Sequence, residues 1–126
     1  MTGRIDIPAE LAGTPFATPE VVSGVGEGWH PLLVELHRRL VEVDPSYRVA
    51  QFKEKFGALR VYVDVSDPER CDAAEAIVEE IERRSATVCE RCGNPGALRQ
   101  GPWVQTLCQE HAAGREPFGA PAATGS

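Results

Sequence analysis

Four potential metal ligands in the last third of the chain restrict its fold more than any other feature of the sequence. Cys89 and Cys92 are three positions apart, and Cys108 and His111 repeat that spacing after an interval of fifteen residues. The pattern C-x2-C-x15-C-x2-H offers three thiolates and one imidazole, a donor set and spacing typical of structural zinc sites. We therefore predict a zinc module over residues 87–113.

The completeness of this ligand set indicates what the metal does. Four protein ligands leave no open coordination position for water or substrate, so we expect structural rather than catalytic Zn²⁺. Zinc binding to such modules contributes on the order of 10 kcal/mol, a large term for a single small domain of 126 residues. The fourth cysteine, Cys71, falls on an apolar helical stripe and is expected to be a buried core thiol.

Composition and charge exclude several classes of protein. Hydrophobic residues make up 42% and charged residues 25% of the chain, as in ordinary globular proteins, and no apolar run is long enough to cross a bilayer. The first residues lack the pattern of a secretory signal, which favours a cytoplasmic location where thiols stay reduced. The net charge of -6 argues against a surface that binds nucleic acid or anionic membranes as a whole, and no membrane partner is expected.

Two segments have the periodicity of amphipathic helices. The first runs from about His30 to Val43, with apolar residues at three- and four-residue steps; Pro31 is tolerated in its first turn, and Pro45 cannot continue it. The second follows a Ser-Asp-Pro turn and carries charged residues opposite its apolar side. That apolar side consists of Cys71, Ala74, Ile77, Val78 and Ile81.

A β-hairpin is expected between the two helices. Apolar and polar side chains alternate from Leu59 to Val65, which is the two-residue period of a half-buried strand, and Tyr47–Lys53 form a weaker strand. Gly57 can take the positive φ that a tight connection between them requires. The second helix should then cover one face of the hairpin.

These elements predict an α+β fold with a helix, β-hairpin, helix core and a C-terminal Cys3His zinc ribbon or treble clef. Residues 1–26 are rich in Gly, Pro and Thr and are expected to be a flexible arm, and residues 114–126 a flexible tail, which leaves a single domain over residues 27–113. A helix beginning near Leu107 should bring Cys108 and His111 to one face. Apolar residues between the ligand pairs should seal the module against the main domain, with Trp103 as a packing residue: Leu98, Trp103, Val104 and Leu107.

Three stretches of the sequence, GWHPLLVELHRRL, FKEKFGALRVYVD, and CERCGNPG with TLCQEHA, resemble a family of small uncharacterised proteins found in bacteria and their phages. The resemblance covers about Gly28 to Ala112. It implies a hairpin carrying a KEKFG-type stretch, here Lys53 to Gly57, and a C-terminal part that looks like a zinc ribbon or treble clef. Ala58 stands where a second glycine often follows that stretch. The resemblance implies no particular activity.

The hairpin is the candidate binding surface. It holds the only two lysines of an acidic chain, with arginines and aromatic residues between them, a combination that can stack bases and neutralise phosphates. The alternative is that the aromatic rings pack in the core or the turn and the cations form a solvated face. The candidate surface comprises Arg48, Phe52, Lys53, Lys55, Phe56, Arg60 and Tyr62.

The sequence therefore favours a non-catalytic, zinc-stabilised binding module, a protein-interaction adaptor or regulator with a protein partner. A nucleic-acid-binding protein that uses the basic and aromatic hairpin is the alternative. A small zinc-containing enzyme is the second alternative, in which His30 and His37 would meet Asp64 or Glu54 in a cleft; these histidines are more simply interpreted as helix-surface residues. Common catalytic signatures such as a P-loop or a nucleophile elbow are absent from the sequence.

Overall fold

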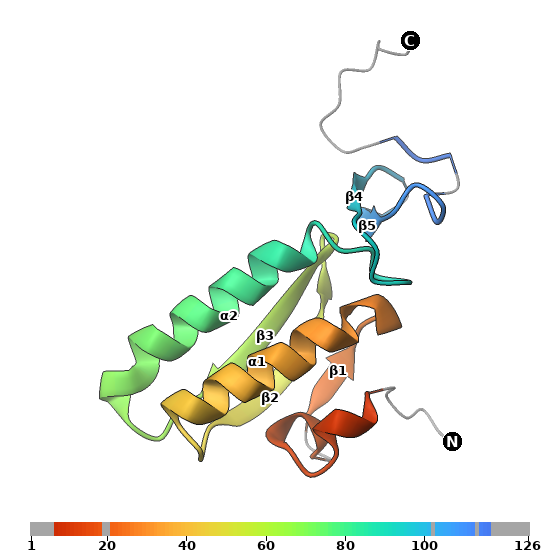
Figure 1. Ribbon diagram of the computed structural model, residues 1–126. Helices are drawn as coiled ribbons and strands as arrows, with labels where there is room; N and C mark the ends of the chain where they lie inside the picture. Colours follow the sequence, from red (N-terminus) through yellow and green to blue (C-terminus); the bar gives the residue numbers. More distant parts are fainter. Residues whose placement is uncertain (1–6, 19–20, 102, 113, 117–126) are drawn as a thin grey trace.

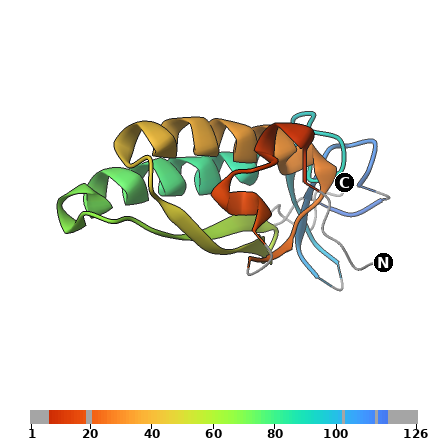
Figure 2. The same cartoon turned by 90° about the horizontal axis from the view of Figure 1, so that it is seen from below.

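A computed structural model describes residues 7–18, 21–101, 103–112 and 114–116 of the chain. Two helices cover one face of a three-stranded sheet, and a second, two-stranded sheet lies at one end of the molecule (Figures 1 and 2). This is a mixed α+β fold, as predicted. The helices are α1 (His30–Val43) and α2 (Cys71–Ser85), and the strands are β1 (Val22–Gly24), β2 (Arg48–Lys55), β3 (Ala58–Asp64), β4 (Ala97–Arg99) and β5 (Gln105–Leu107).

The hairpin of β2 and β3 supplies two of the three strands of the main sheet, with β2 in the middle and β3 at one edge, and its prediction is confirmed. The strands are antiparallel, with Lys55 opposite Ala58. Phe56 and Gly57 connect them, both with positive φ, at 54° and 84°. Two central residues with positive φ make the type I′ turn whose twist matches that of a hairpin.

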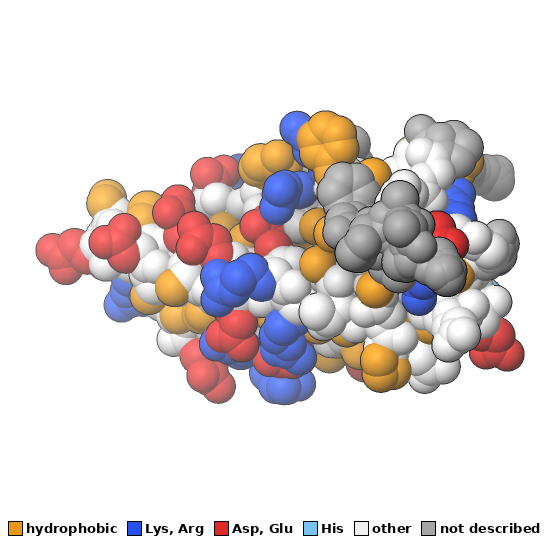
Figure 3. Space-filling model, turned by 90° about the horizontal axis from the view of Figure 1, so that it is seen from above, with side chains coloured by type: hydrophobic (Ala, Val, Ile, Leu, Met, Phe, Trp, Pro, Cys, Tyr) orange, Lys and Arg blue, Asp and Glu red, His pale blue; other side chains and the backbone are white. Residues whose placement is uncertain are grey.

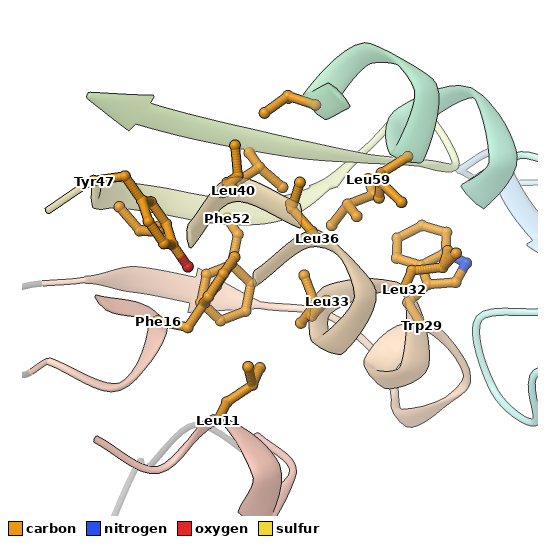
Figure 4. Close-up of a cluster of buried hydrophobic side chains, with 14 of the residues drawn as sticks. Leu11, Phe16, Trp29, Leu32, Leu33, Leu36, Leu40, Tyr47, Phe52 and Leu59 are labelled. Carbon is orange, nitrogen blue, oxygen red and sulfur yellow. The ribbon is translucent and has the colours of Figure 1, made fainter. Parts of the chain in front are cut away.

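The first helix buries one side against this sheet, as its periodicity predicts. The leucines of α1 recur at three- and four-residue steps on the side of the helix that faces the sheet, where they contact side chains from β2 and β3 (Figure 4). Phe52 and Leu59 are fully buried in that layer. The helix contributes Leu32, Leu33, Leu36 and Leu40 to the core.

The N-terminal segment belongs to this core, so the expectation of a flexible arm over residues 1–26 is wrong for its described part. Leu11 and Phe16 lie in two short 3-10 helices and are 0% and 2% exposed. The Phe16 ring meets the Phe52 ring edge to face, with centroids 5.3 Å apart. Strand β1 then pairs parallel to β2. Residues 1–6, 19–20 and most of the predicted tail, 117–126, lie outside the described residues.

The outer edge of β3 is covered by side chains of α2. The backbone N–H of Leu59 donates to Ser85 Oγ at 2.8 Å, and the N–H of Val61 donates to Glu82 Oε2 at 3.0 Å. An edge strand with unpaired amides is a template for pairing with another chain. The second helix therefore satisfies two of the backbone N–H groups at this edge of the sheet.

The end of α1 is tied to the loop after β3 through one carboxylate. Asp44 is 2% exposed and accepts hydrogen bonds from the Ser46 N–H at 2.8 Å, the Ser66 N–H at 2.6 Å and the Ser66 hydroxyl at 3.0 Å. These bonds lower the pKa of Asp44 below its ordinary value, with the Ser66 backbone N–H as the largest cause.

Helix α2 begins where the prediction placed it, but one of its residues has a different environment. Cys71 is the first residue of the helix and is exposed, so its assignment to the core is wrong. The apolar stripe extends to this end of the helix, whereas the buried residues of α2 begin at Ala74. In the described part of the chain, no helix combines the length and the hydropathy needed to cross a membrane.

Candidate metal centre

The four predicted ligands converge on one point. One donor atom from each of Cys89, Cys92, Cys108 and His111 lies within 4.8 Å of all the others. The Sγ atoms of Cys92 and Cys108 are 3.7 Å apart, and His111 Nδ1 lies 3.7 Å from Cys89 Sγ and 3.3 Å from Cys108 Sγ. None of the cysteines forms a disulfide.

These separations fit a tetrahedral metal site. With metal–sulfur bonds of about 2.3 Å and metal–nitrogen bonds of about 2.0–2.1 Å, a tetrahedron places two sulfurs about 3.8 Å apart and a sulfur and a nitrogen about 3.6 Å apart. These three distances lie within a few tenths of an ångström of the tetrahedral values. The four side chains therefore lie close enough to share one metal ion.

Backbone turns place the two ligand pairs. After the first pair, Gly93 has a φ of 85° and its N–H donates to the carbonyl of Cys89 at 2.9 Å, which folds the chain back on itself. In the second pair, the N–H of His111 donates to the Cys108 carbonyl at 3.2 Å. The helix expected from Leu107 is wrong: Leu107 ends β5, and a turn follows it. A single turn suffices to bring residues three positions apart to one ion.

The electrostatics of the cluster favour a bound cation. Burial alone would raise the pKa of Cys89, but backbone N–H groups of Cys108, Cys92 and Arg91 outweigh it and bring the pKa down to about 6. The pKa of Cys92 is raised: a hydrogen bond from the Asn94 backbone lowers it, and burial together with the neighbouring thiols outweighs that bond. Cys89 therefore loses its proton readily, whereas the raised pKa of Cys92 opposes a second negative charge beside it. A bound metal cation would neutralise this repulsion between thiolates.

Gly28 and Trp29, directly before α1, contact the segment that carries the first ligand pair, and we call these two residues the seat. The Trp29 Nε1–H donates to the Val88 carbonyl at 2.8 Å, and the Gly28 N–H donates to the Glu90 carbonyl at 2.7 Å. A Cβ atom added to Gly28 would lie 2.0 Å from the carbonyl oxygen of Cys89. Two backbones therefore pass in direct contact here, and only glycine fits. No sequence pattern predicted this contact, although the glycines before Trp29 are consistent with a close approach of two backbones.

The strands between the ligand pairs rest on the hairpin turn. Thr106 Oγ1 donates to the Gly57 carbonyl at 2.6 Å, and a Cβ on Gly57 would lie 2.5 Å from a methyl group of Leu98 and 3.1 Å from one of Val104. These contacts agree with the expectation that Leu98 and Val104 join the module to the main domain, whereas Leu107 is buried with Cys89 and Cys108 inside the module. Trp103 does not take part, because it is 58% exposed, so its assignment as a packing residue is wrong.

The structure divides the predicted binding surface on the hairpin. Phe52 is 0% exposed and belongs to the core, so its inclusion was wrong. An irregularity between Val49 and Gln51 inserts one extra residue in β2 and shifts which residues face the core. Phe56 and Tyr62 are 73% and 45% exposed. The basic members are Arg48 and Lys55, which are exposed, and Lys53 and Arg60, which are half-buried; Arg60 pairs with Glu82 at 3.6 Å.

The four residues of the enzymatic alternative lie in separate environments. His37 Nδ1 lies 2.7 Å from the hydroxyl oxygen of the buried Tyr47, and the Nε2 atom of His30 is buried without a partner. Glu54 accepts a hydrogen bond from the Gly57 N–H at 2.7 Å. Asp64 is an exposed residue at the end of β3. In the described part of the chain, no hydrogen bond or ion pair joins these four residues.

Fold and cluster together define a class: a small α+β protein with a Cys3His group suited to a metal ion. Comparison of the chain with protein-family models, with curated proteins and with solved structures gives no match. Function therefore has to be argued from the geometry of the molecule itself.

Proposed function

We propose that this chain is a non-catalytic binding module in which Zn²⁺ holds the C-terminal strands against the main domain. The convergence of four donor atoms within 4.8 Å is the observation that carries the proposal. Three thiolates with one imidazole select zinc among the abundant divalent ions. The ion is structural, because the four side chains complete its coordination, and reduced thiols suit a cytoplasmic protein.

The module takes the form of a zinc ribbon. Strands β4 and β5 form an antiparallel pair between the two ligand pairs, and the second pair lies on a turn. A treble clef would carry that second pair at the start of a helix, and the described residues have a turn there. Ribbon architecture agrees with the resemblance to small bacterial and phage proteins and leaves the exposed side chains around it available for a partner.

Binding of a protein is the role that this arrangement supports best. The ribbon contacts both the seat at Gly28 and Trp29 and the hairpin turn at Gly57, so bound metal fixes two parts of the surface relative to each other. Aromatic side chains remain exposed beside these contacts, and such residues are enriched where proteins bind one another. An adaptor or regulator needs a rigid surface of this kind and no reactive group.

The experiment that tests the zinc site combines metal analysis with unfolding. Elemental analysis of protein purified without added metal should find one zinc ion per chain, and Cys92→Ser should abolish stoichiometric zinc. Cys71→Ser is the matched control, because Cys71 is exposed and outside the cluster, and should keep the ion. Protein that folds with full stability in the presence of a strong chelator would overturn the structural role of the metal.

Nucleic acid remains a second candidate partner on one specific observation. The ammonium of Lys55 lies 5.8 Å from the centre of the Phe56 ring, and the guanidinium of Arg115 lies 5.4 Å from that of Trp103. Alternating cations and rings can stack bases of a single strand. Affinity for oligothymidine that falls steeply with salt, and that drops equally in Lys53→Glu and Lys55→Glu, would favour this candidate.

A further inference from the structure

A pocket lies where the hairpin turn meets the loop between β4 and β5. Its volume is about 480 Å³, and its walls come from the hairpin turn on one side and from the loop between β4 and β5 on the other. Of the three large hydrophobic side chains that remain exposed in the described residues, Phe56 and Trp103 line it and Tyr62 does not. We call it the tip pocket, and it is lined by Glu54, Lys55, Phe56, Gly101, Trp103 and Val104.

Phe56 is an unfavourable residue for its position in the hairpin turn. A type I′ turn requires positive φ at both central residues, and Asn or Gly fills these positions with little strain. Phe56 has a φ of 54° and a side chain that is 73% exposed, so it contributes neither a relaxed backbone nor buried apolar area. Strain and exposure together at one aromatic residue indicate that the ring serves something outside the chain.

The tip pocket has more positive than negative charge around it. Lys55 and Arg115 lie over the two rings, and within the described residues neither forms an ion pair. The arginines between the helices are neutralised instead, as in the pair of Arg84 with Glu35 at 2.7 Å. The lining carboxylate of Glu54 is already engaged by the Gly57 N–H. Arg115 also donates a hydrogen bond to the Trp103 carbonyl at 3.2 Å, which holds its guanidinium beside the pocket. Apolar walls with two cations that lack an ion pair in the described part of the chain complement an apolar group that carries negative charge beside it.

We propose that the tip pocket binds an acidic segment of a partner protein through one aromatic or large aliphatic anchor residue. This inference rests on the proposed function and names its partner chemistry. The anchor would lie between Phe56 and Trp103, with acidic neighbours at Lys55 and Arg115. Because Gly101, Trp103 and Val104 belong to the ribbon, the pocket is complete only when the metal holds the ribbon in place.

A nucleic-acid strand fits the same pocket less well. A strand needs cations along a track that follows its phosphates, whereas two cations stand at this rim. Acidic side chains gather over one end of the molecule, where α2 begins (Figure 3), and the chain has a net charge of -6. An extended polyanion would meet that repulsion, but a short acidic segment confined to the pocket would not.

The test selects peptides that bind the zinc-loaded protein from a phage-displayed library of random dodecapeptides. Selected peptides should share an aromatic or large aliphatic residue flanked by Asp or Glu. A synthetic peptide of the selected sequence should bind Phe56→Asn about tenfold or more weakly, while that variant keeps its zinc and unfolds no earlier, because Asn-Gly is the preferred type I′ pair. Tyr62→Ser removes an exposed ring outside the pocket and should leave affinity unchanged.

Charge reversal separates the outcomes further. Lys55→Glu should weaken binding of the selected peptide and reduce its salt dependence, whereas Lys53→Glu, two positions away on the same strand, should change affinity little. The inference fails if selection yields no motif or basic peptides, if Phe56→Asn binds as the parent does, or if oligothymidine displaces the peptide from the pocket. Zinc content and unfolding of each protein are measured alongside, so a failure of the metal site is distinguished from a failure of the pocket.

Discussion

Replacing Gly28 with alanine tests the contact between the N-terminal seat and the first ligand pair. The added methyl carbon would lie 2.0 Å from the Cys89 carbonyl oxygen, 2.6 Å from the Gly93 nitrogen and 2.7 Å from the Glu90 carbonyl carbon. All three neighbours are backbone atoms, so no side-chain rotation can relieve the overlap. The ribbon has to move away, and the hydrogen bond from the Gly28 N–H to the Glu90 carbonyl is then lost.

The expected destabilisation follows from these two effects. Overpacking of a close contact costs about 1–3 kcal/mol, and the lost hydrogen bond adds about 1 kcal/mol. The free energy of unfolding of Gly28→Ala should therefore be about 2–4 kcal/mol lower than that of the parent protein. Urea unfolding of the zinc-saturated protein, followed by tryptophan fluorescence, measures this difference.

A second glycine provides the control for this experiment. Gly13 has a φ of 79° and no atom within 4 Å of an added Cβ, so Gly13→Ala pays only for backbone conformation, about 1–2 kcal/mol. If Gly28→Ala unfolds within about 0.5 kcal/mol of the parent, the two backbones do not approach as described and the seat is not a contact that stabilises the ribbon.

Three further predictions concern other parts of the fold. Ser85→Ala should lower the free energy of unfolding by about 1–3 kcal/mol, because the buried N–H of Leu59 loses its acceptor; Thr87→Ala, at an exposed residue after the same helix, should cost less in the same urea titration. Because the pKa of Asp44 is lowered below its ordinary value of 3.8, its contribution is complete above that pH and is lost as the pH falls through the lowered pKa. Asp44→Asn should therefore destabilise the protein at neutral pH and flatten the acid limb of a plot of urea midpoint against pH, and an unchanged acid limb would contradict this assignment. In zinc-loaded protein, a thiol reagent should modify Cys71 alone among the four cysteines, and all four after chelation; rapid modification of Cys89 with zinc bound would contradict a closed site.

The regular elements and the ligand set were predictable because each follows from a local pattern. The apolar spacing indicated α1, Pro31 and Pro45 indicated its bounds of His30 and Val43, and Gly57 marked the turn of the hairpin. The four ligands were recognisable because metal coordination requires particular side chains at short spacing. These features can be predicted without knowing which distant residues they contact in the fold.

The errors arose where long-range packing decides the environment of a residue. Leu11 and Phe16 are single apolar residues in short 3-10 turns, so no period announces that they reach the core. Phe52 was included in the candidate surface because cations surround it in the sequence, and the alternative, that its ring packs in the core, is confirmed. The extra residue in β2 interrupts the alternation from which its burial could have been predicted. Trp103 is an example of the reverse case, a large apolar residue that the fold leaves outside.

The seat of the ribbon also determines when the domain can be completed. Trp29 is fully buried and bonded to a residue 59 positions later, and Gly26 is bonded to one 64 positions later. During synthesis, the first helix emerges well before Val88 and Glu90, so the Trp29 indole and the Gly26 N–H lack these partners until the later segment arrives. If the proposed zinc ion holds that segment in place, metal binding is the last step of folding, and a shortage of zinc would leave the indole of an otherwise folded domain uncovered.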